Sequence, residues 1–207
     1  MDIPAYLSEV EYSAAGIIPM IWHEHADLAK IRDELVALTR VIEQRYMQAE
    51  SVAMNAENPD DVAMAAGMHW ENYFGDDKKR HHKSINASEL QLRIDARAFS
   101  IGSLCGSLLQ IAKQGISVAH GGLGSCPDGR NVHGHNLKQV IWQGRNQSIH
   151  WEEGNPHPPV QQLFDSLTAN VDAKFGDYRT RNCAFNIVEL LNCQTLDNFK
   201  NDMNLLQ

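Results

Sequence analysis

An arginine and a histidine stand five positions apart in a stretch with a helical pattern of apolar residues. The segment is Arg145-Asn146-Gln147-Ser148-Ile149-His150. On a helix with 3.6 residues per turn, Asn146 and His150 lie one turn apart on the same face, and Arg145 lies beside that row. Gln139 and Gln143 continue the row. This face is therefore rich in uncharged hydrogen-bonding groups, and its charge is concentrated where the arginine and the histidine lie.

These residue types suit the cleavage of an RNA phosphodiester. A guanidinium offers planar, paired donors that match phosphate oxygens and keeps its charge. Imidazole has an ordinary pKa close to neutral pH, so it can move protons. The 2′-hydroxyl of RNA would lose its proton and attack the adjacent phosphate, while Arg145 stabilises charge in the transition state. Because the substrate supplies its own nucleophile, we expect neither a metal nor a cofactor.

The elements that would position these residues are predicted to be helices. Apolar residues repeat at helical spacing along most of the chain, which predicts an all-α fold. After Pro19, a long N-terminal helix of about 25 residues is predicted from a heptad-like stripe. The stripe consists of Leu28, Ile31, Leu35, Leu38 and Ile42. A short helix is predicted to start at Asp60 or Asp61, and a polar loop is predicted near residues 75–85.

A second long helix is predicted to begin near Asn86 and to end at Gly115. Its apolar stripe consists of Leu90, Ile94, Ile101, Leu104, Leu108 and Ile111. Gly102 and Gly106 lie one turn apart, and each costs about 1 kcal/mol relative to alanine in a helix. We therefore expect another backbone to pack closely against this face. A glycine-rich loop is predicted near residues 115–135, and it lacks the Lys-Ser/Thr ending of a phosphate-binding P-loop.

The motif belongs to the third clear helix, predicted over residues 136–153. Its buried side is predicted to consist of Leu137, Val140, Ile141, Gly144 and Trp151. A fourth helix is predicted between Pro159 and Gly176, and a fifth over residues 182–199. No strand pair is predicted. The whole prediction is a single-domain helical bundle of about five main helices over residues 1–207.

Composition and charge narrow the class of protein. The chain has 207 residues, a formal net charge of −8 and 21% charged residues, which excludes a wholly disordered chain. Its four cysteines are far apart without a Cys-x-x-Cys pair, which argues against a zinc ribbon and a disulfide scaffold. No apolar stretch reaches the length of a membrane span, and the first residues lack the pattern of a secretion signal. We therefore expect a cytoplasmic protein with no membrane partner.

The charge is unevenly distributed along the chain. Residues 1–75 have a net charge of −9, residues 76–151 of +5 and residues 152–207 of −4. This asymmetry indicates either a local anion-binding surface on an acidic body or ordinary variation over a solvated surface. The basic run between Lys78 and Lys83 has the same two interpretations, an RNA contact or an exposed polar loop.

An arginine, a polar residue and then a histidine on a late helix of an all-α chain resemble the HEPN superfamily. The resemblance covers residues 145–150 and the order of the helices around them. It implies a helical bundle, a homodimer that brings two motif helices together, and metal-independent endoribonuclease activity, often in a toxin or in phage defence. By this resemblance Arg145 binds phosphate, His150 acts in acid/base catalysis, and Asn146 orients one of them or the substrate. It further implies RNA as the substrate and an antitoxin or regulatory protein as a candidate partner.

Other interpretations of the same residues stay open. Arg145 can instead pair with Glu153 or another acid, and His150 can cap carbonyl groups at the helix end. In that case the chain is a catalytically silent RNA-binding or protein-interaction module. A second Arg-x4-His match, Arg130 to His135, falls in a predicted loop where spacing fixes no geometry. Trp142 is the tryptophan that we expect at a dimer contact.

A divalent-metal site is a weaker alternative. It would combine His150 and Glu153 with histidines elsewhere in the chain, namely His23, His25, His69, His133 and His135. The sequence lacks a Glu-x-x-His pair on each of two helices, which such a site in a helical bundle usually has.

Overall fold

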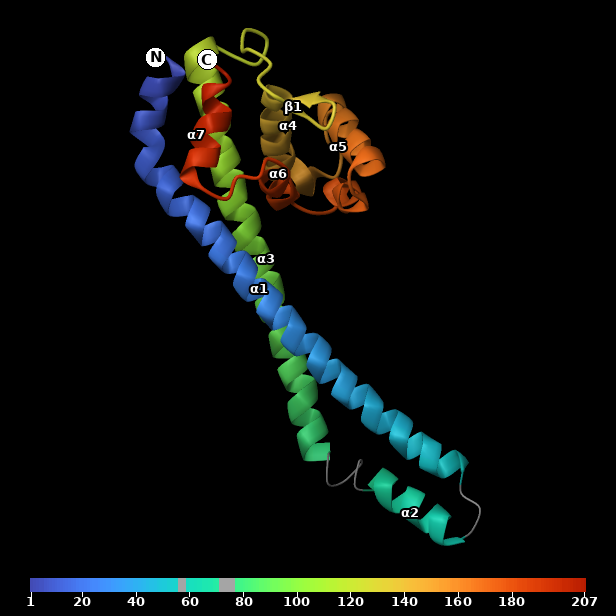
Figure 1. The fold of residues 1–207 in the computed structure, drawn as a ribbon. Coiled ribbons are helices and arrows are strands. Elements are labelled where there is room, and N and C mark those ends of the chain that lie inside the picture. The colour runs from blue at the N-terminus through green and yellow to red at the C-terminus, as the bar shows by residue number, and fades with distance from the viewer. Residues whose placement is uncertain (56–58, 71–76) are drawn as a thin grey trace. The chain divides into compact units, whose positions relative to one another are not determined.

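The structure is a computed structural model that describes residues 1–55, 59–70 and 77–207 (Figure 1). Its helices and strands are, in chain order, α1 (Ile3–Met54), α2 (Pro59–Trp70), α3 (Asp77–His120), β1 (Asn131–Val132), β2 (His135–Asn136), α4 (Leu137–His150), η2 (Trp151–Glu153), α5 (Pro158–Asn170), η3 (Ala173–Arg179), α6 (Ala184–Leu190) and α7 (Leu196–Asn204). The elements η2 and η3 are 3-10 helices. The predicted all-α fold with a long N-terminal helix is confirmed.

The chain divides into two compact units. The first unit consists of residues 1–25 and 99–207, and the second unit of residues 26–98. The first unit contains the predicted motif and all the helices that follow it. The expectation of one domain over residues 1–207 stays a prediction.

Helix α1 begins at Ile3, so the prediction that it starts after Pro19 is wrong. Six apolar residues before and just after Pro19 are buried: Ile3, Tyr6, Leu7, Ala14, Ile18 and Ile21. Their burial outweighs the roughly 3 kcal/mol that an internal proline costs, because each large apolar side chain contributes about 1.5–3 kcal/mol. Pro19 and Ala15, whose carbonyl loses its helical partner, are both exposed, so water can solvate that carbonyl.

In the second unit, the predicted stripe of α1 is confirmed where its side chains are described. Leu28 and Ile31 are buried, and Leu35 and Leu38 are half-buried. The side chain of Ile42 lies outside the described residues. Helix α2 begins at Pro59, one residue before the predicted start, because proline at the first helical position sacrifices no intrahelical hydrogen bond.

Helix α3 is longer than predicted at both ends. It begins at Asp77, so the loop predicted near residues 75–85 is wrong from residue 77 onward, while residues 71–76 lie outside the described part. Lysine and arginine are good helix formers, so a basic run can extend a helix without an apolar stripe. At the other end α3 continues past Gly115. A Cβ there would lie 2.7 Å from Met203 Cε and 2.9 Å from Tyr6 Cδ1, so this glycine allows close packing and does not end the helix.

The predicted glycine-rich loop is therefore shorter and contains a small hairpin. Strands β1 and β2 pair antiparallel, with Asn131 opposite Asn136 and Val132 opposite His135. His133 and Gly134 between them have φ values of 49° and 87°, as in a type I′ hairpin turn. The expectation of no strand pair is wrong at this point, because the pair is too short to produce a periodic pattern.

Helix α4 and its buried side are as predicted, except that Trp151 is only half-buried and lies in η2. Helix α5 ends at Asn170 and not at Gly176, because Asp172 starts the separate helix η3 and accepts a hydrogen bond of 2.9 Å from the backbone N–H of Lys174. The core of this region includes stacked rings of Phe164 and Tyr178, whose centroids are 5.2 Å apart.

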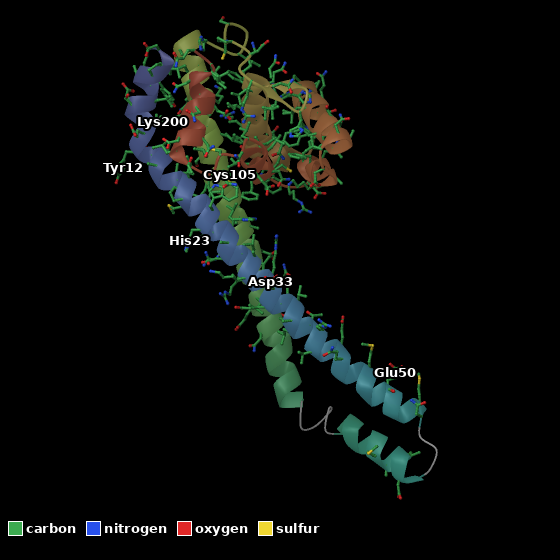
Figure 2. The ribbon with its side chains drawn as sticks, viewed as in Figure 1. Tyr12, His23, Asp33, Glu50, Cys105 and Lys200 are labelled. Carbon is green, nitrogen blue, oxygen red and sulfur yellow. The ribbon has the colours of Figure 1, made fainter. Side chains whose placement is uncertain are left out.

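The predicted fifth helix is two helices, α6 and α7. Asn192 adopts a left-handed φ of 53°, and Thr195 caps α7 by accepting a hydrogen bond from the backbone N–H of Asn198. Helix α7 returns to the N-terminal part of α1, where Nζ of Lys200 lies 2.5 Å from Oε1 of Glu11. Figure 2 labels Lys200 and also Tyr12, which is 91% exposed on α1.

Candidate functional site

Helices α3 and α4 meet along an antiparallel line of side-chain pairs in the first unit. We call this line the α3–α4 seam, and its three pairs are Gly106 with Ser148, Gln110 with Arg145, and Lys113 with Trp142. Residue numbers rise along α3 as they fall along α4, so successive pairs lie about one helical turn apart. The seam carries the predicted motif arginine together with residues of α3 that the motif does not include.

Arg145 is held by neutral amides. Its Nε donates a hydrogen bond of 2.5 Å to Oε1 of Gln110, and one terminal nitrogen donates a bond of 3.3 Å to Oδ1 of Asn146. In the described part of the chain Arg145 forms no ion pair, so a pairing with Glu153 is not found there. These bonds use two of the five N–H groups of a guanidinium, and no carboxylate among the described residues compensates its charge.

The predicted row of amides on α4 is present as a network. The side-chain nitrogen of Asn146 donates a hydrogen bond of 3.3 Å to Oε1 of Gln143, and both residues are half-buried. Gln139, the next residue of the row, is exposed. The structure therefore brings Arg145 and Asn146 together, as the spacing predicts.

His150 lies apart from this network. Its Nδ1 is 2.7 Å from Oε1 of Glu153, and its side chain is 42% exposed. Five residues on an α-helix turn through about 500°, so His150 points about 140° away from Arg145 around α4. The partner of the imidazole is a carboxylate and not the backbone carbonyls of the helix end. Because a carboxylate only accepts, Nδ1 carries the proton, and Nε2 is left as the nitrogen that can exchange one.

Two residues within the motif are buried, which the motif interpretation does not predict. Gln147 is 1% exposed: its amide donates to the carbonyl oxygens of Tyr178 (2.8 Å) and Arg181 (2.7 Å) and accepts from the N–H of Cys183 (2.9 Å). Ser148 is 7% exposed. The apolar stripe of α4 carries the signal for this burial, because positions 147 and 148 follow Gly144 at helical spacing.

An open groove of about 800 Å³ lies next to one end of the seam. Its lining includes small residues of α3 and, from the end of α4 onward, Ser148, Ile149 and Glu152. The small residues are Gly102, Ser103, Gly106 and Ser107. Gln110, which holds Arg145, also lines the groove, whereas Arg145 and His150 do not.

The two glycines expected to meet another backbone meet side chains instead. A Cβ at Gly102 would lie 3.4 Å from the side chain of Asn182, and one at Gly106 would lie 3.3 Å from Oγ of Ser148. The prediction that another backbone packs against these glycines is therefore wrong, and both pack against polar side chains beside the groove.

Residues 99–151 are strongly biased toward positive charge. They contain four basic side chains and only one acid, Asp128. Two of these bases are paired: Nζ of Lys138 lies 2.9 Å from Oδ1 of Asp128, and Nε of Arg130 lies 2.6 Å from Oδ1 of Asp202. The other two are Lys113 and Arg145, for which the described part of the chain provides no ion pair. Both lie on the α3–α4 seam.

The other candidate sites of the sequence have structural roles in the first unit. Arg130 is bound to Asp202, and Nε2 of His135 lies 2.9 Å from Oγ of Ser166, so the second Arg-x4-His match serves to anchor the hairpin. Burial lowers the pKa of His135. All four cysteines are free and buried.

Of the residues considered for a divalent-metal site, the structure brings His150 and Glu153 together. Among the described residues no three His, Cys, Asp or Glu side chains are placed to hold a metal ion, and His150 meets only Glu153. The side chains of His69 and of the basic run at residues 78–83 lie outside the described residues. No helix in the described part is long and apolar enough to cross a membrane.

The chain matches no family model, no curated protein and no solved structure. The resemblance to the HEPN superfamily therefore rests on residues 145–150 and the order of the helices around them. The features of the chain that bear on function are the α3–α4 seam, the Arg145 network and the His150–Glu153 pair.

Proposed function

We propose that this protein is a metal-independent endoribonuclease whose site contains Arg145, Asn146 and His150. The observation that carries the proposal is that Arg145 is oriented by the neutral amides of Gln110 and Asn146, without an acid, on the helix whose end carries a half-exposed histidine. An oriented, uncompensated guanidinium is suited to a phosphate, because no internal carboxylate competes for it.

The roles follow from the partners of each side chain. Arg145 would bind the scissile phosphate and stabilise its transition state, and Asn146 would fix the guanidinium. His150 would take the proton of the 2′-hydroxyl at Nε2, because Glu153 holds Nδ1 and orients the ring. As the 2′-oxygen bonds to phosphorus, the bond from phosphorus to the 5′-oxygen breaks, which leaves a 2′,3′-cyclic phosphate, and the departing 5′-oxygen takes a proton from water. A histidine oriented by a carboxylate is a recurring arrangement for general bases.

The separation of about 140° around α4 favours a composite site in a homodimer. In one chain Arg145 and His150 face different directions, whereas two antiparallel motif helices could place the arginine of one copy opposite the histidine of the other. As the resemblance implies, such a nuclease would serve as a toxin, a phage-defence protein or a stress effector. It would act on RNA in the cytoplasm, and an antitoxin or regulatory protein would restrain it.

A catalytically silent RNA-binding or protein-interaction module is the second candidate. It is favoured by the absence of any bond between His150 and Arg145 or Asn146 in the described part of the chain. In this case the seam would bind RNA, or the groove would bind a protein, without cleavage.

RNA cleavage in excess chelator tests the first candidate. General acid/base catalysis typically contributes about 10²–10⁴-fold, so His150→Ala should lower the rate by at least about a hundredfold. Arg145→Ala should cost about 10²–10³-fold. His157→Ala is the matched control, because His157 is exposed and makes no side-chain cap bond. Undiminished cleavage by Arg145→Ala and His150→Ala would contradict the assignment, and binding without cleavage by the natural protein would favour the second candidate.

Mixing the two inactive variants tests the composite site. A dimer of one Arg145→Ala chain and one His150→Ala chain retains one site with an intact arginine and an intact histidine. If half of the mixed dimers are of this kind, about a quarter of the natural activity should return, since each has one of two sites. No recovery, with subunit exchange verified, would place both groups in the same chain.

A further inference from the structure

The seam continues beyond Arg145 to a second cation and an aromatic ring. Nζ of Lys113 lies 4.6 Å from the centroid of the Trp142 ring, and both side chains are half-buried. Lys113 follows Gln110 by three residues, and Trp142 precedes Arg145 by three. This pair is thus displaced from the Gln110–Arg145 pair by about 4.5 Å along the helices.

Lys113 has an aromatic partner but, among the described residues, no acidic one. Lysines that only solvate a helix usually lie fully exposed or beside an acid, whereas Lys113 is half-buried on an indole and has no ion pair in the described part of the chain. Between residues 99 and 127 the chain has no acid at all. In the described part of the chain no acid pairs with Lys113 or Arg145, so the positive charge on this stretch of the seam is not neutralised by an ion pair.

We propose that Lys113 and Trp142 form a second nucleotide-binding subsite for single-stranded RNA, next to Arg145 on the α3–α4 seam. The proposal rests on the proposed function in taking RNA as the ligand, but it does not require cleavage. Lys113 binds the phosphate that neighbours the one held by Arg145, and the indole of Trp142 stacks on a base. Cationic grooves lined by aromatic rings bind single strands in this way.

Equilibrium binding of a fluorescently labelled oligouridine of about 12 nucleotides tests the subsite, measured by anisotropy at several salt concentrations. The oligouridine carries a 2′-O-methyl group on every nucleotide, so that the probe cannot be cut whether or not His150 is catalytic. Lys113→Gln should weaken binding and reduce the salt dependence by a slope of about 0.7, the value for one phosphate contact on a single strand. Trp142→Leu should weaken binding about tenfold without changing the slope, and Trp142→Phe should retain most of the affinity.

Lys174→Gln is the matched control. It removes one lysine charge as Lys113→Gln does, but Lys174 is paired with Glu189 at 2.6 Å. It should leave the salt slope unchanged. If the two lysine substitutions have equal effects, RNA binding depends on the overall charge of the protein and not on the seam, and the proposal is overturned. Thermal unfolding shows whether each variant is folded. If Trp142→Leu does not fold, Trp142→Phe still tests whether an aromatic ring at this position is enough for binding.

The outcomes separate this subsite from the proposed cleavage. If Arg145→Ala and His150→Ala cut RNA normally while the Lys113 and Trp142 variants lose affinity, the cleavage assignment fails and the subsite stands. If cleavage depends on Arg145 and His150 but the Lys113 and Trp142 variants bind normally, the subsite is overturned. It is also overturned if no oligouridine binds at low salt, or if Trp142→Leu abolishes a dimer and leaves RNA affinity unchanged.

Discussion

Replacement of Gln147 by alanine should destabilise the first unit more than any exposed change on the same helix. The Gln147 amide makes three hydrogen bonds, to the carbonyls of Tyr178 and Arg181 and to the N–H of Cys183. They fix the end of η3 and the segment that leads to α6 against the last turn of α4. Gln147→Ala leaves three backbone groups without their partner and opens a space where the side chain was.

The magnitude follows from the burial of these groups. Leaving one buried polar group unsatisfied costs about 1–3 kcal/mol. Water that enters the vacated space would satisfy some of the three backbone groups. We therefore expect a loss of about 3–5 kcal/mol in the free energy of unfolding. Gln147→Glu should also destabilise at neutral pH, because a carboxylate cannot donate to the two carbonyls. It should recover in part as the pH falls and the carboxyl acquires a proton that it can donate.

Urea unfolding followed by far-ultraviolet circular dichroism measures both effects. The control is Gln139→Ala, because Gln139 is an exposed glutamine on the same helix, and its replacement should change stability by no more than about 0.5 kcal/mol. A loss below about 1 kcal/mol for Gln147→Ala, with an unchanged dependence on urea, would show that the three hydrogen bonds do not stabilise the fold as we argue.

Two further predictions concern the ion pair and the thiols of the first unit. Arg130 donates two hydrogen bonds, of 2.6 and 2.7 Å, to the carboxylate of Asp202. Asp202→Asn removes the charge of the acceptor and should lower the free energy of unfolding in urea by about 2 kcal/mol. No loss would show that solvent compensates for the ion pair. Burial raises the pKa values of Cys183 and Cys193 to about 12 from 9.0, so the unfolded chain releases these protons first as the pH rises above 9. The free energy of unfolding should therefore be unaffected below pH 9 and should decrease between pH 9 and about pH 12, with a loss of about 1.4 kcal/mol per thiol at pH 10. A variant with alanine at both positions should lose correspondingly less stability over the same range. Identical pH profiles for the variant and the natural protein would contradict this account.

The sequence predicts best where a pattern is local. The apolar stripe of α4 correctly predicts the helix and the buried positions Leu137, Val140, Ile141 and Gly144, because burial on one face repeats every three or four residues. The predicted end at residue 153 is wrong, since α4 ends at His150 and a 3-10 turn follows. The same stripe, extended by one turn, also indicates the burial of Gln147 and Ser148. An amide at a buried position is a clear sign of a partner, but the pattern cannot name it, since Tyr178 and Cys183 lie more than 30 positions away.

The errors in helix length have a non-local origin. Pro19 and Gly115 are helix-breaking residues by propensity, yet both lie inside helices. Gly115 is tolerated because Tyr6 and Met203 need the space of its missing side chain. Local propensities amount to about 1–3 kcal/mol per residue, which the burial of several apolar side chains in tertiary contacts exceeds.

At the candidate site too, the sequence predicts contacts between residues close in sequence but not contacts between distant ones. Spacing predicts correctly that Arg145 and Asn146 meet: adjacent side chains diverge by about 100° around a helix, and the long side chain of Arg145 spans that separation. It does not reveal Gln110, which holds Arg145 from another helix, nor that Glu153 in the following 3-10 turn holds the ring of His150. An Arg-x4-His spacing on a straight helix separates its two groups by about 140°, so the motif alone does not build a site. A binding site also needs side chains from a second element. For Arg145, helix α3 supplies such side chains at the seam. Under the proposed function the corresponding surface for His150 would be supplied by a second copy of the chain, which is why subunit mixing is the decisive experiment for the motif.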